Sequence, residues 1–486
     1  MEPGVFKPND PADAAPAAHA ARWIRAALFA AFLLALALRV RGLIAFPYDQ
    51  DELYTIVEAR DLFRTAIKPG IDSRPLYYLL QHPLLSLLPQ TEVALRLLPL
   101  LFGMLGVWAT WRFGKKALGA SGGLIATFLV AISPWHLYAS TTARYYSLVY
   151  LWAALAFSLI PEAYDSDRPA SYRVSFLVLL LGTLTHPSFV FPVVGLVLAL
   201  AIMQRDSRLQ WRWPTRTAWT WLWGPYASAL CVEVIVLRVA GRGSALGNLG
   251  TRGLMATLRL LPAMVDWMTV VVFAAAAAGA VLLCRSRENG RRRWGVVAIL
   301  TVVCVFCALF VASFYTGVYA DYGIGMLPIT FIAAAGFVVL IAGARELSAS
   351  VTLAAIFVFG AAVAPSTASY LADGTRFDYR GAYARIERDA PSLAVLTWPV
   401  VIQQHYAPRL RVYELLNRPT NLDSLLAREG NLWLVASVKR YGIVYDDQRL
   451  VETWASTHCQ IIERFERSRF DYRLYRVDLY RCKQPR

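Results

Sequence analysis

The stretch Ala27–Glu52 reads ALFAAFLLALALRVRGLIAFPYDQDE, a long apolar run followed at once by three acidic residues. The run is long enough to cross a bilayer, because about 20 apolar residues span the hydrocarbon core. The acids are therefore expected at the membrane surface, where a carboxylate beside a low-dielectric region can serve as a base. This stretch indicates a membrane protein and a candidate site for its chemistry.

The whole chain has the composition of a polytopic membrane protein. Of its 486 residues 57% are hydrophobic, and the mean hydropathy is +0.44, which differs from the balance of soluble enzymes. Apolar windows recur along the chain and predict a mostly α fold with roughly eleven transmembrane helices. The windows lie near 24–46, 92–113, 122–137, 146–160, 174–184, 187–203, 217–239, 262–284, 295–315, 324–342 and 351–364.

Polar segments flank this membrane part. Residues 1–22 are rich in Pro and Ala and lack the features of a signal peptide, so they are expected to form a disordered cytoplasmic tail. Residues 23–366 would form the transmembrane domain, with a first outer loop, 47–91, that carries the acids and two helices lying at the interface. Residues 367–486 alternate strand-like and helix-like stretches, which predicts an extracytoplasmic α/β domain.

The last two strand-like stretches of this domain are flanked by Cys459 and Cys482. If these strands pair as a hairpin, the two cysteines come close together. An oxidising outer compartment would then let them form a disulfide.

Basic residues set the expected orientation, because short cytoplasmic loops are enriched in Lys and Arg. Clusters in alternate loops place the N-terminus inside, and both the loop 47–91 and the C-terminal domain outside. The net charge of +16 is not accompanied by a nucleic-acid recognition motif. The clusters include Lys115, Lys116, Arg205, Arg208, Arg291, Arg292 and Arg293.

A second set of arginines falls on the outer side, where topology does not require them. Any one of them could contact lipid head groups or acidic side chains. As a set they favour an anionic ligand at the outer interface. They are Arg39, Arg41, Arg60, Arg64, Arg74, Arg96, Arg144, Arg238, Arg242, Arg252 and Arg259.

The acidic stretch allows three interpretations. Asp49 and Asp51 have the D-x-D spacing of metal-binding nucleotide-sugar transferases, but there the motif follows a strand of a sheet, and here it follows a transmembrane helix. Asp51 could instead be a general base, with Glu52 adjusting its pKa. The acids could also simply end a helix and face water.

The histidines lack metal-site spacing, so no metal site is expected.

Three more outer segments extend the pattern: SRPLYYLLQHPLL (Ser73–Leu85), SPWHLYASTTARYYSL (Ser133–Leu148) and THPSFVFP (Thr185–Pro192). With the Asp51–Glu52 pair they resemble the GT-C glycosyltransferases of the dolichyl-phosphate-mannose-protein mannosyltransferase type, which include bacterial transferases of aminoarabinose, galacturonate and mannose. The resemblance implies metal-independent, inverting transfer from a polyprenyl-phosphate sugar, without a cofactor. The acceptor would be a glycan, lipid or protein at the outer face of a bacterial cytoplasmic membrane.

The resemblance also implies roles for residues. Asp51 would be the base for the acceptor hydroxyl, with Glu52 as the second member of the catalytic pair. The substrate-binding residues would be Arg144, Tyr145, Tyr146 and His186. Arg74, one place from the family's cation, is a further candidate for substrate binding. Tyr77 could stack on a sugar or anchor the chain at the membrane interface.

Two departures from the family pattern are Ser73-Arg74-Pro75, where relatives have His or Lys before Pro-Pro, and Asp321-Tyr322, where they often have Arg-Tyr. Arg252 or Arg259 would then supply a missing phosphate ligand. The departures keep open a catalytically degenerate assembly partner. A transporter or flippase of an anionic polyprenyl lipid is a further alternative, although the inverted repeats typical of transporters are not found in the sequence.

Overall fold

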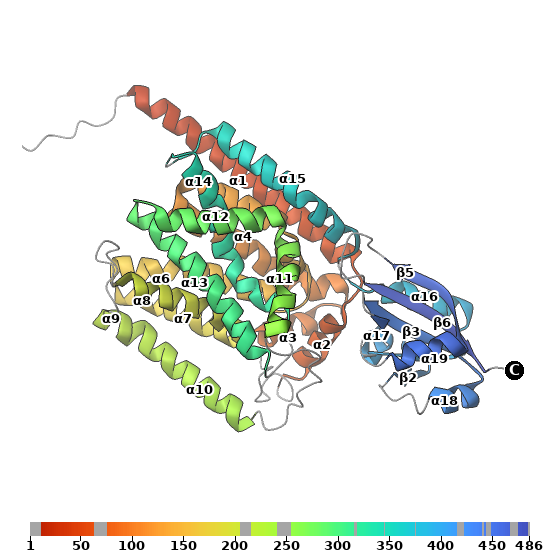
Figure 1. Ribbon diagram of the computed structural model, residues 1–486. Coiled ribbons are helices and arrows are strands. Elements are labelled where there is room, and N and C mark those ends of the chain that lie inside the picture. Colours follow the sequence, from red (N-terminus) through yellow and green to blue (C-terminus); the bar gives the residue numbers. More distant parts are fainter. Residues whose placement is uncertain are drawn as a thin grey trace, which may run out of the picture.

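The computed structural model shows a helical body joined to a smaller unit containing a β-sheet (Figure 1). It describes residues 11–62, 75–204, 215–240, 254–314, 318–344, 346–374, 376–415, 422–439, 442–443, 449–466 and 475–484. Arg74 and Arg252, both expected to bind substrate, lie outside these residues.

The helical body extends to the end of α15, and its helices run in several directions across the molecule (Figure 1). Its α-helices are α1 (Pro11–Ala45), α2 (Gln50–Arg60), α3 (Pro75–Leu87), α4 (Glu92–Ile132), α5 (Pro134–Thr141), α6 (Tyr146–Ser166), α7 (Pro169–Thr185), α8 (Val190–Gln204), α9 (Arg216–Ala218), α10 (Gly224–Ala240), α11 (Leu254–Met268), α12 (Val270–Arg285), α13 (Asn289–Ala312), α14 (Leu327–Ile341) and α15 (Ala349–Asp373). Shorter turns are the 3₁₀-helices Pro187–Phe189 and Ala320–Met326 and the π-helix Trp219–Trp223.

Within the described ranges, six helices are long and apolar enough to cross a membrane, or seven if the bent pair Thr257–Met268 and Val270–Arg285 is one span. The number eleven is thus not established. One reason is that some expected spans form shorter apolar helices, Pro169–Thr185 and Pro187–Met203. The multi-pass character of the body agrees with its outward apolar side chains, such as Phe29, Ile44 and Phe357, which are 65, 65 and 75% exposed.

Helix α4 holds two of the expected windows, because it reverses direction inside its 41 residues. Gly119 has φ 86° and ψ 178°, a backbone conformation that favours glycine. On either side of it the chain returns along itself, since a Cβ on Gly114 would lie 2.8 Å from the Cα of Gly123. Lys115 and Lys116 therefore lie just before the turn of a helical hairpin, remote from Glu92 at the start of α4.

The N-terminal segment differs from expectation. Helix α1 begins at Pro11, so residues 11–22 are helical rather than part of a disordered tail. The alanines in this segment have the highest helix propensity of all residues, which outweighs its scattered prolines. Residues 1–10 lie outside the described part of the chain.

The segment after α15 folds around a six-stranded sheet of order β2-β1-β3-β6-β5, with β4 paired to β3. Strands β1 and β2 are parallel, as are β1 and β3, whereas β6 is antiparallel to β3 and β5. This segment is called the C-terminal unit below. Its elements are α16 (Tyr379–Asp389), β1 (Ala394–Thr397), α17 (Val400–Tyr406), β2 (Val412–Glu414), α18 (Leu422–Glu429), β3 (Asn431–Lys439), β4 (Gly442–Ile443), α19 (Leu450–His458), β5 (Cys459–Glu466) and β6 (Arg476–Lys483).

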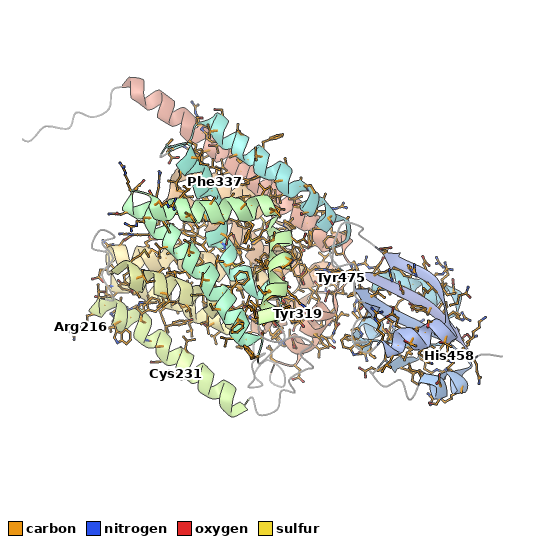
Figure 2. The ribbon with its side chains drawn as sticks, viewed as in Figure 1. Arg216, Cys231, Tyr319, Phe337, His458 and Tyr475 are labelled. Atoms are coloured by element: carbon orange, nitrogen blue, oxygen red, sulfur yellow. A yellow bond between two sulfur atoms is a disulfide. The ribbon has the colours of Figure 1, made fainter. Side chains whose placement is uncertain are left out.

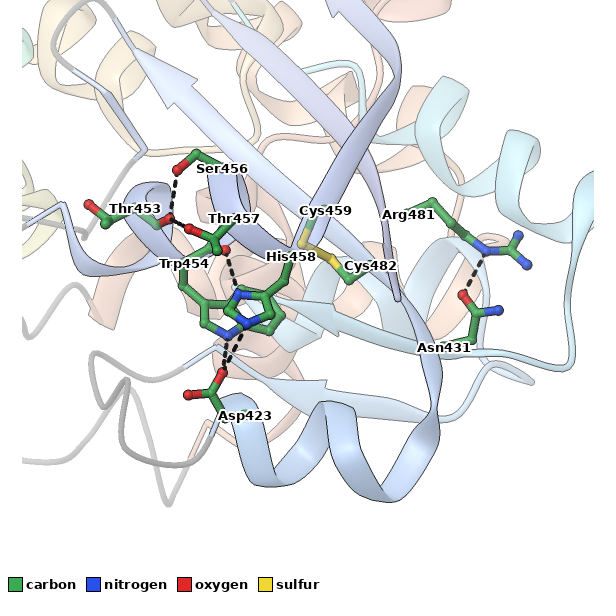
Figure 3. Close-up of a disulfide and its surroundings, with 10 residues drawn as sticks. All are labelled: Asp423, Asn431, Thr453, Trp454, Ser456, Thr457, His458, Cys459, Arg481 and Cys482. Atoms are coloured by element: carbon green, nitrogen blue, oxygen red, sulfur yellow. Dashed lines mark hydrogen bonds and ion pairs between the residues drawn. A yellow bond between two sulfur atoms is a disulfide. The ribbon is translucent and has the colours of Figure 1, made fainter. Parts of the chain in front are cut away.

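Cys459 and Cys482 stand opposite each other in the β5–β6 pair and form a disulfide (Figure 3). Cys482 is completely buried on the face of the sheet that packs against α18 and α19. The bridge therefore ties the last strand to the end of α19.

The C-terminal unit packs directly against the helical body. Tyr48, Leu53 and Ile56, from the acidic stretch and α2, belong to the same buried cluster as Tyr383 and Trp433 of the unit. A shared hydrophobic core of this kind fixes the unit against the end of the first span.

Candidate functional site

The acidic stretch folds as the start of a helix. Asp49 is the N-cap of α2, and its side chain accepts a hydrogen bond from the backbone N–H of Asp51 at 3.0 Å. In return, the Glu52 carboxylate accepts a hydrogen bond from the backbone N–H of Asp49 at 2.9 Å. This reciprocal capping box explains why the span ends and a new helix begins here.

Glu52 is completely buried and lies at the centre of an ion cluster. Arg96 of α4 donates two hydrogen bonds to its carboxylate, at 2.8 and 2.7 Å, and Arg376 of the segment after α15 lies 3.1 Å from it. The backbone N–H of Ala143 donates another at 2.8 Å. Burial alone would raise the pKa of Glu52, but Arg376 and Arg96 outweigh it and lower the pKa to about 2.

These contacts occupy both oxygens of the Glu52 carboxylate. Glu52 is also not among the residues that line the cavity described next. The geometry therefore assigns it a positioning role within the expected catalytic pair, whereas Asp51 faces the cavity.

A cavity of about 310 Å³ lies where the acidic stretch meets the C-terminal unit. Its size is at the lower end of the range of small-molecule sites, roughly 300–1,000 Å³. It is lined by Asp49, Gln50, Asp51, Tyr138, Arg144, Tyr145, Tyr146, Tyr319, Asp321, Tyr322, Phe377, Tyr379, Trp398, Ser437 and Tyr475.

Asp51 and Arg144 form the charged centre of this cavity. Oδ2 of Asp51 lies 3.8 Å from Nη2 of Arg144, and the Asp51 side chain is 49% exposed whereas that of Arg144 is 8% exposed. Arg144 also donates to the backbone oxygen of Asp51 at 3.3 Å and to the hydroxyl of Tyr78 at 3.4 Å. A largely buried cation is thus held beside an accessible carboxylate.

Asp49 and Asp321 are the other acids that line the cavity. Burial of the Asp49 side chain, followed by the charge of Asp51, raises the pKa of Asp49. Among the described residues, no group of three or more His, Cys, Asp or Glu side chains is arranged to hold a metal ion.

Of the aromatic residues expected to bind substrate, two line the cavity and two lie beside Tyr145 without lining the cavity. Tyr145 and Tyr146 line the cavity, with ring centroids 4.7 Å apart. His186 stacks on Tyr145 at 4.2 Å, and its Nδ1 accepts a hydrogen bond from the backbone N–H of Ser188. Tyr77 is fully buried, 6.4 Å from Tyr145. His186 and Tyr77 therefore support the Tyr145 ring from behind the cavity.

Several outer arginines have partners that differ from the expected anion. Arg96 is committed to Glu52, and Arg39 donates to the backbone oxygens of Ala35, Val130 and Ala131. Arg259 is exposed on α11 and is not among the lining residues. Of the arginines in the expected outer set that the structure describes, Arg144 is the one that lines the cavity.

Sequence reasoning did not identify the residues that the C-terminal unit brings to the cavity. These are Phe377, Tyr379, Trp398, Ser437 and Tyr475. They come from four separate segments of the unit, so no spacing in the sequence joins them. One feature of the sequence could have pointed to two of them. Trp398 directly follows a strand-like stretch and Tyr475 directly precedes another, and residues at the ends of neighbouring strands can lie close together at one edge of a sheet.

The family model described as dolichyl-phosphate-mannose-protein mannosyltransferase matches residues 68–237. Among solved structures, the chain is similar to apo ArnT from Cupriavidus metallidurans, at 13% identity over 95% of this chain and 98% of that chain, with a TM-score of 0.52. It is also similar to the apo oligosaccharyltransferase of Archaeoglobus fulgidus, at 12% identity over 85% of this chain and 69% of that chain, again with a TM-score of 0.52.

No curated protein sequence matches the chain. At such low identities the structural likeness establishes the fold alone. The family match covers the segment that holds the Arg144 turn and His186, and the fold is shared by nearly the whole chain. The chain therefore shares its fold with these two transferases, and its residues 68–237 match the dolichyl-phosphate-mannose-protein mannosyltransferase family model.

Proposed function

We propose that the protein transfers a sugar from a polyprenyl-phosphate donor to an acceptor of the cell envelope, which is a glycan, a lipid or a protein. The acceptor hydroxyl oxygen attacks C1 of the donor sugar as the bond from C1 to the phosphate oxygen breaks, so that C1 inverts. Asp51 takes the hydroxyl proton. Arg144 pairs with the departing polyprenyl phosphate, which lowers the barrier without a metal ion or cofactor.

The observation that carries this proposal is the pairing of Asp51 and Arg144 in one cavity, 3.8 Å apart. An inverting displacement needs a base on one side of the reacting carbon and charge stabilisation on the other. In the free protein Arg144 pairs with Asp51 and also with Glu58, whose carboxylate lies 3.6 Å away. A donor phosphate would compete for Arg144 and leave the Asp51 carboxylate ready to accept a proton.

The position of the cavity supports a reaction at the outer membrane face. The site lies near Arg96, in the first turns of α4, whereas Lys115 and Lys116 lie beside the hairpin turn far along the same helix. Because basic residues mark the cytoplasmic side, the opposite end of α4 faces outward. The name of the matched family indicates a dolichyl-phosphate sugar, which supports a lipid-linked donor here.

The proposal is tested with purified protein in lipid nanodiscs and radiolabelled polyprenyl-phosphate sugars, supplied one at a time with cell-envelope acceptors in EDTA. The wild type is expected to form labelled product, and Asp51→Asn is expected to form it about 10²–10⁴ times more slowly. Asp61→Asn, which alters an exposed acid at the other end of α2, is the matched control and should retain activity.

A folded wild type that forms no product with any donor would overturn the proposal in favour of a transporter or an assembly partner. Full activity of Asp51→Asn would remove Asp51 from the role of base. Product that disappears in EDTA and returns with a divalent ion would refute the metal-independent scheme.

A further inference from the structure

We propose that the wall of the cavity formed by the C-terminal unit binds the acceptor, and that the group bound there is an uncharged saccharide ring. This assignment rests on the proposed function, because it divides the same cavity into a donor side and an acceptor side. It narrows the acceptor from any envelope molecule to one that offers a sugar hydroxyl.

The wall is made mainly of aromatic side chains. Phe377, Trp398 and Tyr475 are each partly buried and line the cavity from three separate segments of the unit. The rings of Phe377 and Tyr475 are 5.0 Å apart with an interplanar angle of 68°. Figure 2 labels Tyr475 on this wall near Tyr319 of the helical body, at the junction of the two parts.

Two hydroxyl groups complete the wall. Tyr379 is almost completely buried, and its hydroxyl and that of Ser437 are 2.5 Å apart. Aromatic faces can stack on the C–H faces of a sugar ring, while hydroxyls can exchange hydrogen bonds with its edge. This mixture of a few polar groups and several aromatic rings is typical of small-molecule sites.

The distribution of charged residues around the cavity argues against a charged acceptor group at the aromatic wall. Among the described lining residues, those from the C-terminal unit include no Asp, Glu, Lys or Arg, whereas the opposite wall holds Asp49, Asp51, Asp321 and Arg144. A phosphate or carboxylate placed against the aromatic wall would lose hydration without gaining a counter-charge. A neutral saccharide does not incur that cost.

The geometry of the reaction places the donor against the helical body and the acceptor against the C-terminal unit. A lipid-linked donor enters from the helical body, and its phosphate is drawn to Arg144 on that side. The acceptor must present its hydroxyl to Asp51 from the remaining direction, which is the side of the C-terminal unit. The aromatic wall is therefore left to the acceptor.

The test measures saccharide binding without requiring turnover. Saturation-transfer difference NMR is recorded for methyl hexopyranosides and for their 6-phosphates, with the full chain in nanodiscs. The wild type is expected to give signals with some of the neutral glycosides and weaker signals with the phosphates. Trp398→Leu and Tyr475→Leu, which keep much of the apolar volume, should lose most of the signal.

Tyr413→Leu is the matched control, because Tyr413 is also partly buried in the unit but lies on β2 and outside the cavity lining. It should retain the wild-type signal. Each variant is checked for an unchanged melting temperature. Absence of signal with every neutral glycoside, or equal signals in all folded variants, would overturn the proposal.

A kinetic measurement separates this proposal from the proposed function. With a working donor, Trp398→Leu should raise KM for the acceptor while leaving slow donor hydrolysis, measured without acceptor, unchanged. A parallel loss of hydrolysis and transfer would place Trp398 on the donor side and overturn the proposal. If the wild type binds glycosides but uses no donor, the transferase function fails while the saccharide site stands.

Discussion

Glu52 and Arg376 form an ion pair 3.1 Å long in which both side chains are completely buried. Arg376 also donates hydrogen bonds to the backbone oxygens of Pro47 and Thr141 and to the hydroxyl of Thr142. One side chain at the start of the C-terminal unit therefore contacts the end of the first span, the acidic helix and the turn that carries Arg144. The cavity has its shape because this unit is held against all three.

Arg376→Met should loosen this attachment. Removing one partner of a buried ion pair leaves the other charge uncompensated, which costs about 3–5 kcal/mol. We expect a lower melting temperature in nanodiscs and a fall in kcat for transfer, with partial recovery in Arg376→Lys. Arg388→Met, at an exposed arginine of α16, is the control and should behave like the wild type. An unchanged melting temperature in Arg376→Met would show that the pair does not hold the unit in place.

Glu52→Gln should separate stability from catalysis at the acidic pair. The amide leaves Arg96 and Arg376 without a buried counter-charge, so the melting temperature should fall, whereas Asp51→Asn should leave it nearly unchanged. Because the folded pKa of Glu52 is about 2, below its ordinary value of 4.5, the ion pair stabilises the protein at pH values above 4.5. That contribution is lost as the pH falls from 4.5 through 2.

The melting temperatures of the wild type and Glu52→Gln should therefore converge over this pH interval. Differential scanning fluorimetry from pH 7 to the lowest pH at which the nanodiscs stay intact provides the measurement. A gap that stays constant as the solution is acidified would contradict the charge-based account of Glu52.

Local patterns in the sequence single out several of the residues that line the cavity, namely Asp51, Arg144, Tyr145 and Tyr146. The D-Q-D-E order predicts a carboxylate at the end of a span, and the alternation of basic loops predicts the side on which Arg144 lies. They assign the base to Asp51 and a supporting part to Glu52, but they could not predict the burial of Glu52 against Arg376, which approaches from a distant part of the chain. For the same reason Arg96 is interpreted from sequence as a ligand for an anion, although its partner is Glu52.

Contacts between segments far apart in the sequence were also beyond prediction, although the helices themselves were not. Apolar windows identify the two halves of α4, and Gly119 permits the reversal between them. The aromatic wall could not be predicted, since Phe377, Trp398 and Tyr475 become neighbours only through the sheet topology.

Removal of the Cys459–Cys482 disulfide should destabilise the C-terminal unit. A disulfide that closes a loop with a sequence separation of 23 residues restricts the unfolded chain, which is worth about 2–4 kcal/mol. Addition of a membrane-permeant reductant should lower the melting temperature of the wild type but not that of the Cys459→Ala/Cys482→Ala double variant. Equal responses of both proteins would show that the bridge contributes nothing to stability.

Asp51→Asn should lower kcat for transfer by about 10²–10⁴, the range expected when a general base is lost. The half-exposed Asp51 side chain has room for the amide, so folding should be unaffected. Binding of undecaprenyl phosphate, measured by native mass spectrometry, should persist, because Arg144 keeps its charge and loses one of its two carboxylate partners, with Glu58 remaining 3.6 Å away. Loss of lipid binding together with activity would indicate that Asp51 organises the phosphate site instead of accepting a proton.

Arg144→Gln should weaken binding of the same lipid, whereas Arg144→Lys should retain part of it. The guanidinium can hold a phosphate through two parallel hydrogen bonds, and lysine keeps the charge but not this geometry. Arg60→Gln, at an exposed arginine of the last turn of α2, controls for the general loss of a positive charge near the membrane. The expected order of affinity is wild type, Arg60→Gln, Arg144→Lys and Arg144→Gln. Should Arg60→Gln and Arg144→Gln lose affinity equally, the phosphate would be attracted by surface charge, and Arg144 would have no specific part in binding the donor.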